Sequence, residues 1–111
     1  MATRPEVRIG IVGYGTMGRA HNYGYRAAPV LTELAATPRV VVISGREEAA
    51  VKAAAARYDI PQWTTDWREL VRRPDIDVVD ICTPPGTHAL PDTVLLLKAR
   101  RRRAYRTFLH R

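Results

Sequence analysis

The sequence predicts an α/β fold with a doubly wound parallel sheet, and three observations support this prediction. Short runs of apolar, β-branched residues alternate with segments of helical periodicity. Each strand and the helix after it occupy about 25 to 35 residues, which suits crossover connections between parallel strands. A glycine-rich turn follows the first apolar run. Four strands joined in this way take the order 3-2-1-4, so the sheet is the incomplete first part of a doubly wound fold.

The first strand is predicted over residues 7–12, because the apolar run VRIGIV is too short for a helix. A helix follows from Thr16, and Pro29 is expected to limit it. Residues at spacings of three and four along this helix form the stripe that is expected to face the sheet: Met17, Ala20, Gly24 and Ala27.

The second strand is predicted over residues 39–44, where β-branched residues are dense, and Gly45 ends it. The alanine-rich segment 46–58 then forms a helix, with Glu47 and Glu48 in the first turn, where the helix dipole favours acids. Its buried face is predicted to consist of Ala50, Ala54 and Tyr58.

A short third strand is predicted over residues 62–64, and Asp66 and Glu69 have the spacing of a capping box for the helix after it. Pro74 ends that helix. The fourth strand is predicted over residues 76–83 and a fourth helix over residues 87–99. The apolar side of this last helix consists of Leu90, Val94 and Leu97.

The glycine-rich turn has the pattern G-x-G-x-x-G at Gly13, Gly15 and Gly18. The first glycine permits a tight turn, the second lets a pyrophosphate approach the backbone, and the third lets the helix pack closely on the strand. The unpaired amides of the following helix then bind the phosphates. Because the motif joins a strand to a helix inside a βαβ unit, it predicts a Rossmann-type dinucleotide site.

The residues after the second strand bear on the choice of cofactor. An acid there would bind the adenosine ribose, whereas an arginine suits a 2′-phosphate. The sequence reads Ser44, Gly45, Arg46, which favours NADP over NAD. Two alternatives stay open: Arg46 is a solvated residue at a helix start, or Glu47 or Glu48 reaches the ribose.

Thr83, Pro84 and Pro85 leave the fourth strand at the switch point of the sheet, where a bound cofactor is expected to pass. The alternative is that these prolines only end the strand. His88 lies just beyond and is read as a helix cap or surface residue rather than a catalyst. His21 is expected to pack or to hydrogen-bond to the nearby loop, Cys82 to be a small buried residue, and no metal site is predicted.

The positive charge lies at one end of the chain. The seven basic residues of segment 98–111 account for the net charge of +7, because the other 11 Lys and Arg residues match the 11 acids. We therefore divide the chain into a dinucleotide-binding domain, residues 1–99, and a basic tail, residues 100–111. Nucleic-acid binding through this tail is a lesser alternative, as is a makeshift fifth strand over residues 104–109. The absence of a long apolar run predicts a cytoplasmic protein, and the uncovered sheet edge predicts a homo-oligomer.

Three segments together resemble the N-terminal domain of the Gfo/Idh/MocA oxidoreductases: RIGIVGYGTMGRAH, VVVISGREEAAVKAAAARYDIP and TTDWRELVRRPDIDVVDICTPPGTHA. The resemblance implies an NAD(P)-dependent enzyme acting on sugars, cyclitols or related polyols, with a second domain completing the substrate site. By the same resemblance, one group of residues holds the pyrophosphate: Gly13, Tyr14, Gly15, Thr16, Met17 and Gly18. Ser44, Gly45 and Arg46 face the ribose. Thr83, Pro84 and His88 line the path to the nicotinamide.

The sequence departs from the family after Ala99. The family continues with a fifth strand and a Glu-Lys-Pro motif whose lysine is catalytic, whereas residues 100–111 read RRRRAYRTFLHR. We therefore expect a truncated or frameshifted oxidoreductase domain that is inactive alone and has no catalytic residues of its own. The alternative is a non-catalytic dinucleotide-binding module or subunit. Hydride transfer needs a positioned substrate as well as a cofactor, so substrate is expected only if a second domain completes the site.

Overall fold

The computed structural model describes residues 5–83 of the 111-residue chain, so the predicted fourth helix and the basic tail lie outside the described residues. Strands and helices alternate along this part of the chain, as predicted. They are β1 (Glu6–Val12), α1 (Thr16–Leu31), β2 (Thr37–Ser44), α2 (Glu48–Arg57), β3 (Gln62–Thr64), α3 (Trp67–Arg72) and β4 (Val78–Ile81).

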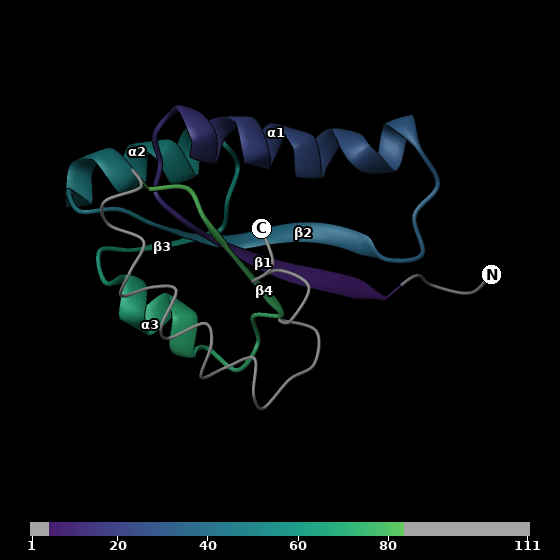
Figure 1. The fold of residues 1–111 in the computed structure, drawn as a ribbon. Coiled ribbons are helices and arrows are strands. Elements are labelled where there is room, and N and C mark those ends of the chain that lie inside the picture. Colours follow the sequence, from purple (N-terminus) through teal and green to yellow (C-terminus); the bar gives the residue numbers. More distant parts are fainter. Residues whose placement is uncertain (1–4, 84–111) are drawn as a thin grey trace.

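The four strands form one parallel sheet in the order β3-β2-β1-β4, which confirms the predicted topology (Figure 1). β1 lies in the middle and pairs with β2 on one side and β4 on the other. The register between β1 and β2 shifts after Ile9, which pairs with Val40, whereas Gly10 pairs with Val42. Val41 is therefore an extra residue that interrupts the alternation of the strand.

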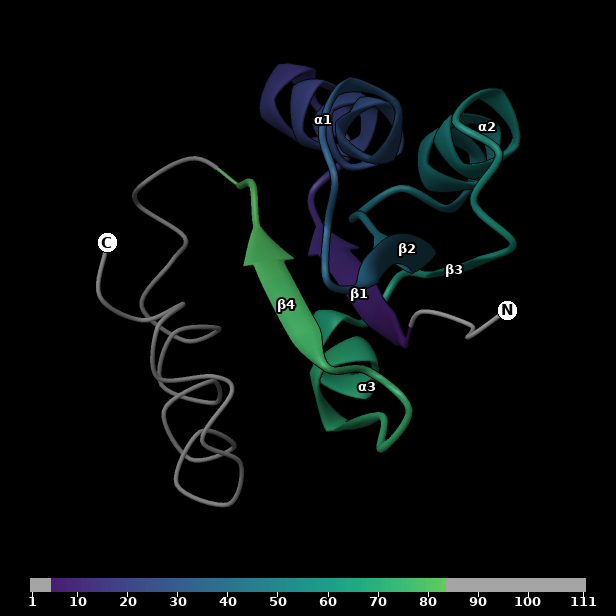
Figure 2. The same cartoon turned by 90° about the vertical axis from the view of Figure 1, so that its right-hand side faces the viewer.

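The helices form two layers around the sheet. Figure 2 shows α1 and α2 on one face and α3 on the other, the arrangement that right-handed crossovers produce in a doubly wound fold. The carboxyl ends of β1, β2 and β4 meet at one edge of the sheet, where the N-terminus of α1 also lies.

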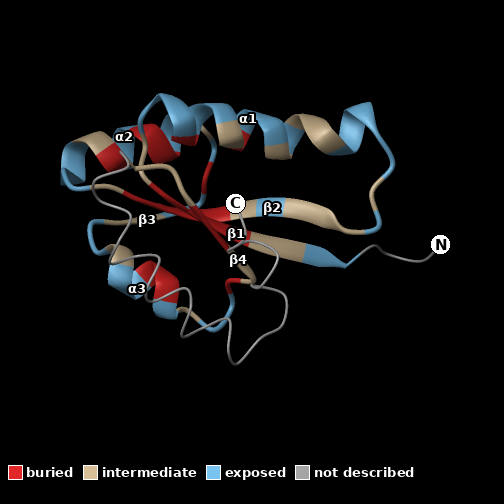
Figure 3. Ribbon diagram, in the orientation of Figure 1, coloured by how far each residue is buried: buried red, intermediate tan, exposed pale blue. Residues whose placement is uncertain are grey.

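The core lies on both sides of the sheet, where buried strand residues meet equally buried residues of α2, α3 and the adjoining loops (Figure 3). One cluster fills the space between the sheet and α3: Val12, Val41, Val42, Leu70, Val71, Ile76 and Val79. A second lies between the sheet and α2: Ile9, Ile11, Ile43, Val51, Ala55 and Ile60. Burial of these β-branched strands on both faces explains why they read as continuous apolar runs.

The predicted face of α1 is wrong. Met17 is 55% exposed, and Ala20 and Gly24 are also exposed, whereas the buried residues of the helix are Gly18 and Asn22. The apolar spacing misled because this helix contacts the sheet mainly through polar and small residues. Pro29 does not end the helix either, since α1 continues to Leu31. Proline removes one helical hydrogen bond and its ring crowds the carbonyl one turn back, and α1 ends two residues after Pro29.

The other elements differ from prediction in smaller ways. β2 begins two residues earlier than predicted, and β4 extends only from Val78 to Ile81. The sheet-facing side of α2 is centred on Val51, Ala54 and Ala55, so Ala54 was assigned correctly and Ala50 lies at the margin.

The capping box of α3 forms only in part. Asp66 caps the helix by accepting a hydrogen bond from the Arg68 amide at 3.0 Å. The Asp66 amide donates to the Thr64 hydroxyl, while Glu69 accepts a hydrogen bond from the same hydroxyl instead of reaching back to Asp66.

Candidate functional site

The turn after β1 requires glycine at its first position. Gly13 has a φ of 108°, a conformation that residues with a side chain rarely adopt. Its amide donates a hydrogen bond of 2.9 Å to the Ser44 carbonyl at the end of β2. A Cβ on Gly13 would lie 3.0 Å from the carbonyl carbon of Cys82, just after β4. The turn is therefore held closely between the ends of β2 and β4, the two strands that flank β1.

The other two glycines of the motif have opposite surroundings. A Cβ on Gly18 would overlap the Gly13 carbonyl oxygen, so the first turn of α1 packs directly against the preceding loop. A Cβ on Gly15 would meet no atom of the described residues within 4 Å, so space is open beside this residue. These are the close packing and the open approach that the sequence motif predicts.

The N-terminus of α1 is suited to bind an anion. Gly15 is the N-cap residue, and because it has no side chain it cannot satisfy the first amides of the helix. The first turn also contains no acid. The unpaired amides and the helix dipole at Thr16, Met17 and Gly18 are therefore available to a phosphate group.

The predicted ribose-binding residues lie beside this turn. The ring of Tyr14 lies so close to Gly45 that a Cβ there would overlap it. Ser44 is buried, while Arg46 is exposed, as are Glu47, the N-cap of α2, and Glu48. Within the described part of the chain Arg46 makes no hydrogen bond or ion pair, so its guanidinium is available to a ligand.

The structure thus brings most of the predicted site residues to one edge of the sheet. Thr83 is among them, because its methyl carbon would lie 3.2 Å from a Cβ on Gly13. Pro84 and His88 lie outside the described residues. The group at this edge consists of Gly13, Tyr14, Gly15, Thr16, Met17, Gly18, Ser44, Gly45, Arg46 and Thr83.

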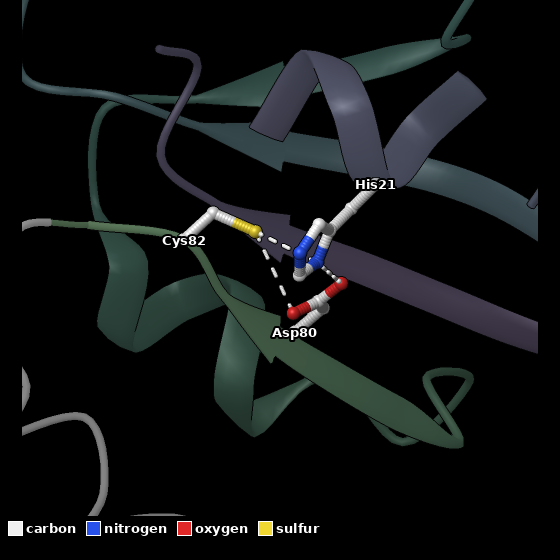
Figure 4. A group of neighbouring side chains, drawn as sticks. All are labelled: His21, Asp80 and Cys82. Carbon is white, nitrogen blue, oxygen red and sulfur yellow. Dashed lines mark hydrogen bonds and ion pairs between the residues drawn. The ribbon is translucent and has the colours of Figure 1, made fainter. Parts of the chain in front are cut away.

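A second polar cluster, which sequence reasoning missed, is centred on Asp80 of β4 (Figure 4). Asp80 is 5% exposed, and its Oδ2 atom lies 2.6 Å from His21 Nδ1 and 2.7 Å from the Tyr25 hydroxyl. The Cys82 sulfur lies 3.4 Å from His21 Nδ1 and 3.5 Å from Asp80 Oδ1. His21 therefore bonds to a buried strand carboxylate, and its second contact is Cys82, just after that strand. The sequence signal is the spacing of two polar pairs. Asp80 and Cys82 are two residues apart at the end of the fourth strand, and His21 and Tyr25 are four residues apart on α1, so each pair lies on one side of its element.

Cys82 also differs from expectation, since it is only half-buried and has polar neighbours. His21, Asp80 and Cys82 offer three ligand atoms within 4.8 Å of one another, so they form a group that could hold a metal ion. Two ligands of one tetrahedral zinc, each about 2.0–2.1 Å from the ion, lie roughly 3.3 Å apart. The 2.6 Å between His21 and Asp80 is instead the length of a direct hydrogen bond. The group is arranged as a hydrogen-bonded network.

The strongest electrostatic perturbation lies away from both groups, in the turn after α3. The Arg73 guanidinium bonds to Asp75 at 2.7 Å and 3.0 Å and holds the pKa of that carboxyl well below its usual range. The same contact raises the pKa of Arg73. The Asp75 side chain is 40% exposed, so this pair is a surface ion pair and not part of the site.

The fold and the glycine turn define the class of protein as a dinucleotide-binding Rossmann domain. The family described as the oxidoreductase family with an NAD-binding Rossmann fold, GFO_IDH_MocA, matches residues 7–98. The chain therefore belongs to the Gfo/Idh/MocA oxidoreductases, and these residues form their NAD-binding domain.

Similar proteins agree with this assignment. Levoglucosan dehydrogenase of Pseudarthrobacter phenanthrenivorans is 41% identical over 86 residues, which are 76% of this chain and 22% of that protein. A levoglucosan dehydrogenase structure in complex with NADH and levoglucosan matches with a TM-score of 0.77 and 36% identity, over 80% of this chain and 24% of that one. Myo-inositol dehydrogenase from Lactobacillus casei, in complex with NAD(H) and myo-inositol, matches with a TM-score of 0.62 and 31% identity, over 81% and 24% of the two chains.

The chain thus spans about a quarter of the length of the relatives that it matches. None of the helices that the structure describes is both long enough and apolar enough to cross a membrane.

Proposed function

We propose that this chain binds a nicotinamide dinucleotide at the carboxyl edge of the sheet and supplies the cofactor site of an oxidoreductase acting on sugars, cyclitols or related polyols. The observation that carries the proposal is the N-terminus of α1. It is capped by a glycine, bordered by the tight Gly13 turn and open beside Gly15. Helix amides that lack a side-chain cap and border open space fit a pyrophosphate. The sugar and cyclitol substrates named for the related dehydrogenases support the substrate class.

The residues divide into three roles. Six residues cradle the pyrophosphate: Gly13, Tyr14, Gly15, Thr16, Met17 and Gly18. Ser44, Gly45 and Arg46 border the adenosine ribose, and Tyr14 covers Gly45 between these two regions. Thr83 lies on the path to the nicotinamide, and we extend that path to Pro84 and His88, beyond the described residues. The cofactor carries the hydride, while these residues bind and orient it.

We further propose that NADP binds more tightly than NAD. Arg46 is exposed beside Gly45, and a guanidinium pairs well with a 2′-phosphate. The competing prediction is NAD, because levoglucosan dehydrogenase has been solved with NADH and because Glu47 and Glu48 are exposed one and two residues further on.

Titration of the purified chain with NADPH and NADH, followed by fluorescence, tests both parts of the proposal. Arg46→Ala is expected to weaken NADPH binding by about tenfold or more, the usual loss for a charge-assisted contact, and to leave NADH binding nearly unchanged. Arg57→Ala removes another exposed arginine, at the C-terminal end of α2, and serves as the control. Binding of neither cofactor would refute the proposed function, and tighter NADH binding would refute the NADP preference alone.

A second candidate is a non-catalytic dinucleotide-binding module. It is favoured by the sequence after Ala99, which lacks the Glu-Lys-Pro motif within these 111 residues. Measuring cofactor reduction with levoglucosan and myo-inositol distinguishes the candidates. Binding without turnover favours the module or a requirement for further residues, and turnover by the chain itself excludes the module. A cytoplasmic location, homo-oligomerisation and the absence of nucleic-acid binding remain predictions.

A further inference from the structure

We infer that Asp80 is a positioning residue for the dinucleotide site: its buried carboxylate anchors α1 through His21 and Tyr25 and thereby sets where the N-terminal amides of the helix lie. That the ligand at this helix end is a dinucleotide rests on the proposed function. The anchor itself is a property of the chain, so it can be measured without any ligand.

The first observation is that α1 has little apolar attachment to the sheet. Of its 16 residues, only Gly18 and Asn22 are buried. Within residues 5–83, neither apolar cluster includes a buried residue of α1, and Tyr25 is the α1 residue that packs against one of them. By contrast, α2 is shorter and buries Val51, Ala54 and Ala55. Something other than apolar burial must hold α1 in place.

The second observation is the geometry at Asp80. One carboxylate oxygen accepts two short hydrogen bonds from α1, from His21 Nδ1 at 2.6 Å and from the Tyr25 hydroxyl at 2.7 Å. A carboxylate can only accept, so Nδ1 carries the proton of the first bond. The Cys82 thiol donates to the other oxygen, Oδ1, at 3.5 Å. A carboxylate that is 5% exposed would be very costly to bury without donors, and these contacts supply them.

The third observation is where these contacts lie along α1. Gly18 packs against the Gly13 carbonyl in the first turn, and His21 and Tyr25 follow one and two turns later on the same side. The glycine contact limits how closely the helix approaches the turn, and the Asp80 contacts fix its rotation about its axis. Together they orient the amides of Thr16 and Met17, which are on the same rigid helix.

The rival role for Asp80 is general stability, with no particular effect on the helix end. The two roles differ in measurable ways. Loss of a positioning contact loosens α1 more than α2 and weakens cofactor binding, whereas loss of general stability affects all slowly exchanging amides alike and leaves the affinity of the folded protein unchanged.

The experiment compares Tyr25→Phe with Ile76→Val. Tyr25→Phe removes one hydroxyl and keeps the ring, while Ile76→Val removes one methyl group from the cluster on the opposite face of the sheet. Asp80→Asn and Asp80→Ala form a second pair, in which asparagine keeps one acceptor oxygen. Each variant is measured by residue-resolved amide hydrogen exchange without ligand and by titration with NADPH and NADH.

We expect Tyr25→Phe to accelerate exchange in α1 by about threefold to tenfold, with no matching change in α2, and to raise the cofactor Kd by a similar factor. Asp80→Asn should retain part of the protection and affinity that Asp80→Ala loses. Ile76→Val should change neither the ratio of exchange in α1 to that in α2 nor the Kd. Equal effects of Tyr25→Phe and Ile76→Val would overturn the inference. If the unmodified chain bound neither cofactor, the proposed function would fail, and the exchange data alone would decide whether the anchor exists.

Discussion

Two helices on opposite faces of the sheet, α1 and α3, are held by different forces. α3 has six residues and places Leu70 and Val71, both fully buried, against the strands. α1 has 16 residues, yet it leaves Tyr23, Val30 and Leu31 exposed. Apolar contacts are strong but tolerant of small shifts, whereas hydrogen bonds are directional. The comparison suggests that the helix whose end must present amides to a ligand is held by the contacts that define its orientation best.

The N-termini of α1 and α3 also differ, because only α3 has a side-chain cap. The Asp66 side chain accepts the Arg68 amide and so closes the start of α3. The N-cap of α1 is Gly15, which has no side chain that could accept a hydrogen bond. A capped helix end is complete in itself, while an uncapped end beside open space retains amides for another molecule.

The largest expected effect on stability is at a buried residue of α3, compared with an exposed residue of α1. Leu70→Ala removes a fully buried side chain that packs against Gly10, so we expect the free energy of unfolding to fall by about 2–5 kcal/mol. Val30→Ala, at a residue of α1 that is 84% exposed, should change it by less than about 0.5 kcal/mol. Urea denaturation measures both values. Similar losses for the two variants would contradict the contrast between the helices.

The next effect concerns the glycines of α1. Gly18→Ala forces the new methyl group against the Gly13 carbonyl, and we expect a stability loss of about 1–3 kcal/mol together with weaker cofactor binding. Gly15→Ala meets open space, so it should cost less than about 1 kcal/mol but still weaken binding, because the methyl group enters the phosphate approach.

Gly24→Ala is the control for both glycine variants, because a Cβ there also meets no described atom within 4 Å. It should stabilise the helix by about 0.5–1 kcal/mol and leave the Kd unchanged. Thermal unfolding and cofactor titration give the two quantities. Unchanged binding in Gly15→Ala would argue against a pyrophosphate at this helix end.

A smaller effect is expected at the closed end of α3. Asp66→Ala leaves the Arg68 amide without its acceptor, so stability should fall by about 1 kcal/mol, the usual value of an N-cap. Asp66→Asn retains an acceptor oxygen and should recover most of the loss. Denaturation midpoints report both changes, and equal losses in the two variants would argue against a capping role for the Asp66 side chain.

The smallest expected effect on stability is at Asp75, a carboxylate that is partly exposed. Because the Arg73 contact lowers the pKa of Asp75 in the folded state, the pair stabilises the protein above about pH 4, and this contribution is lost as the pH falls below that value. Asp75 is 40% exposed, so we expect Asp75→Asn to cost only about 0.5 kcal/mol at pH 7 and nothing at very low pH. Urea denaturation of both proteins at several pH values checks this, and a constant difference between them would contradict it.

Much of the fold follows from local patterns in the sequence. β-branched runs mark the strands, the alanine-rich segment marks α2, and the spacing of Gly13, Gly15 and Gly18 marks the turn, because each of these features acts over a few residues. The sheet-facing side of α1 could not be found in this way. A search for apolar periodicity selects Met17 and Ala20, whereas the contacts that matter are polar and come from a strand 59 residues away in the sequence.

The sequence alone therefore determined the order of strands and helices, the parallel topology and the glycine turn, since hydrophobic period, glycine geometry and crossover handedness are local or general rules. Only the tertiary structure decided which atoms meet across those elements. Asp80 contacts α1 because the β1–β4 pairing brings β4 under that helix. Gly18 is crowded because the Gly13 turn folds back on it, whereas Gly15 faces open space because the turn folds away from it.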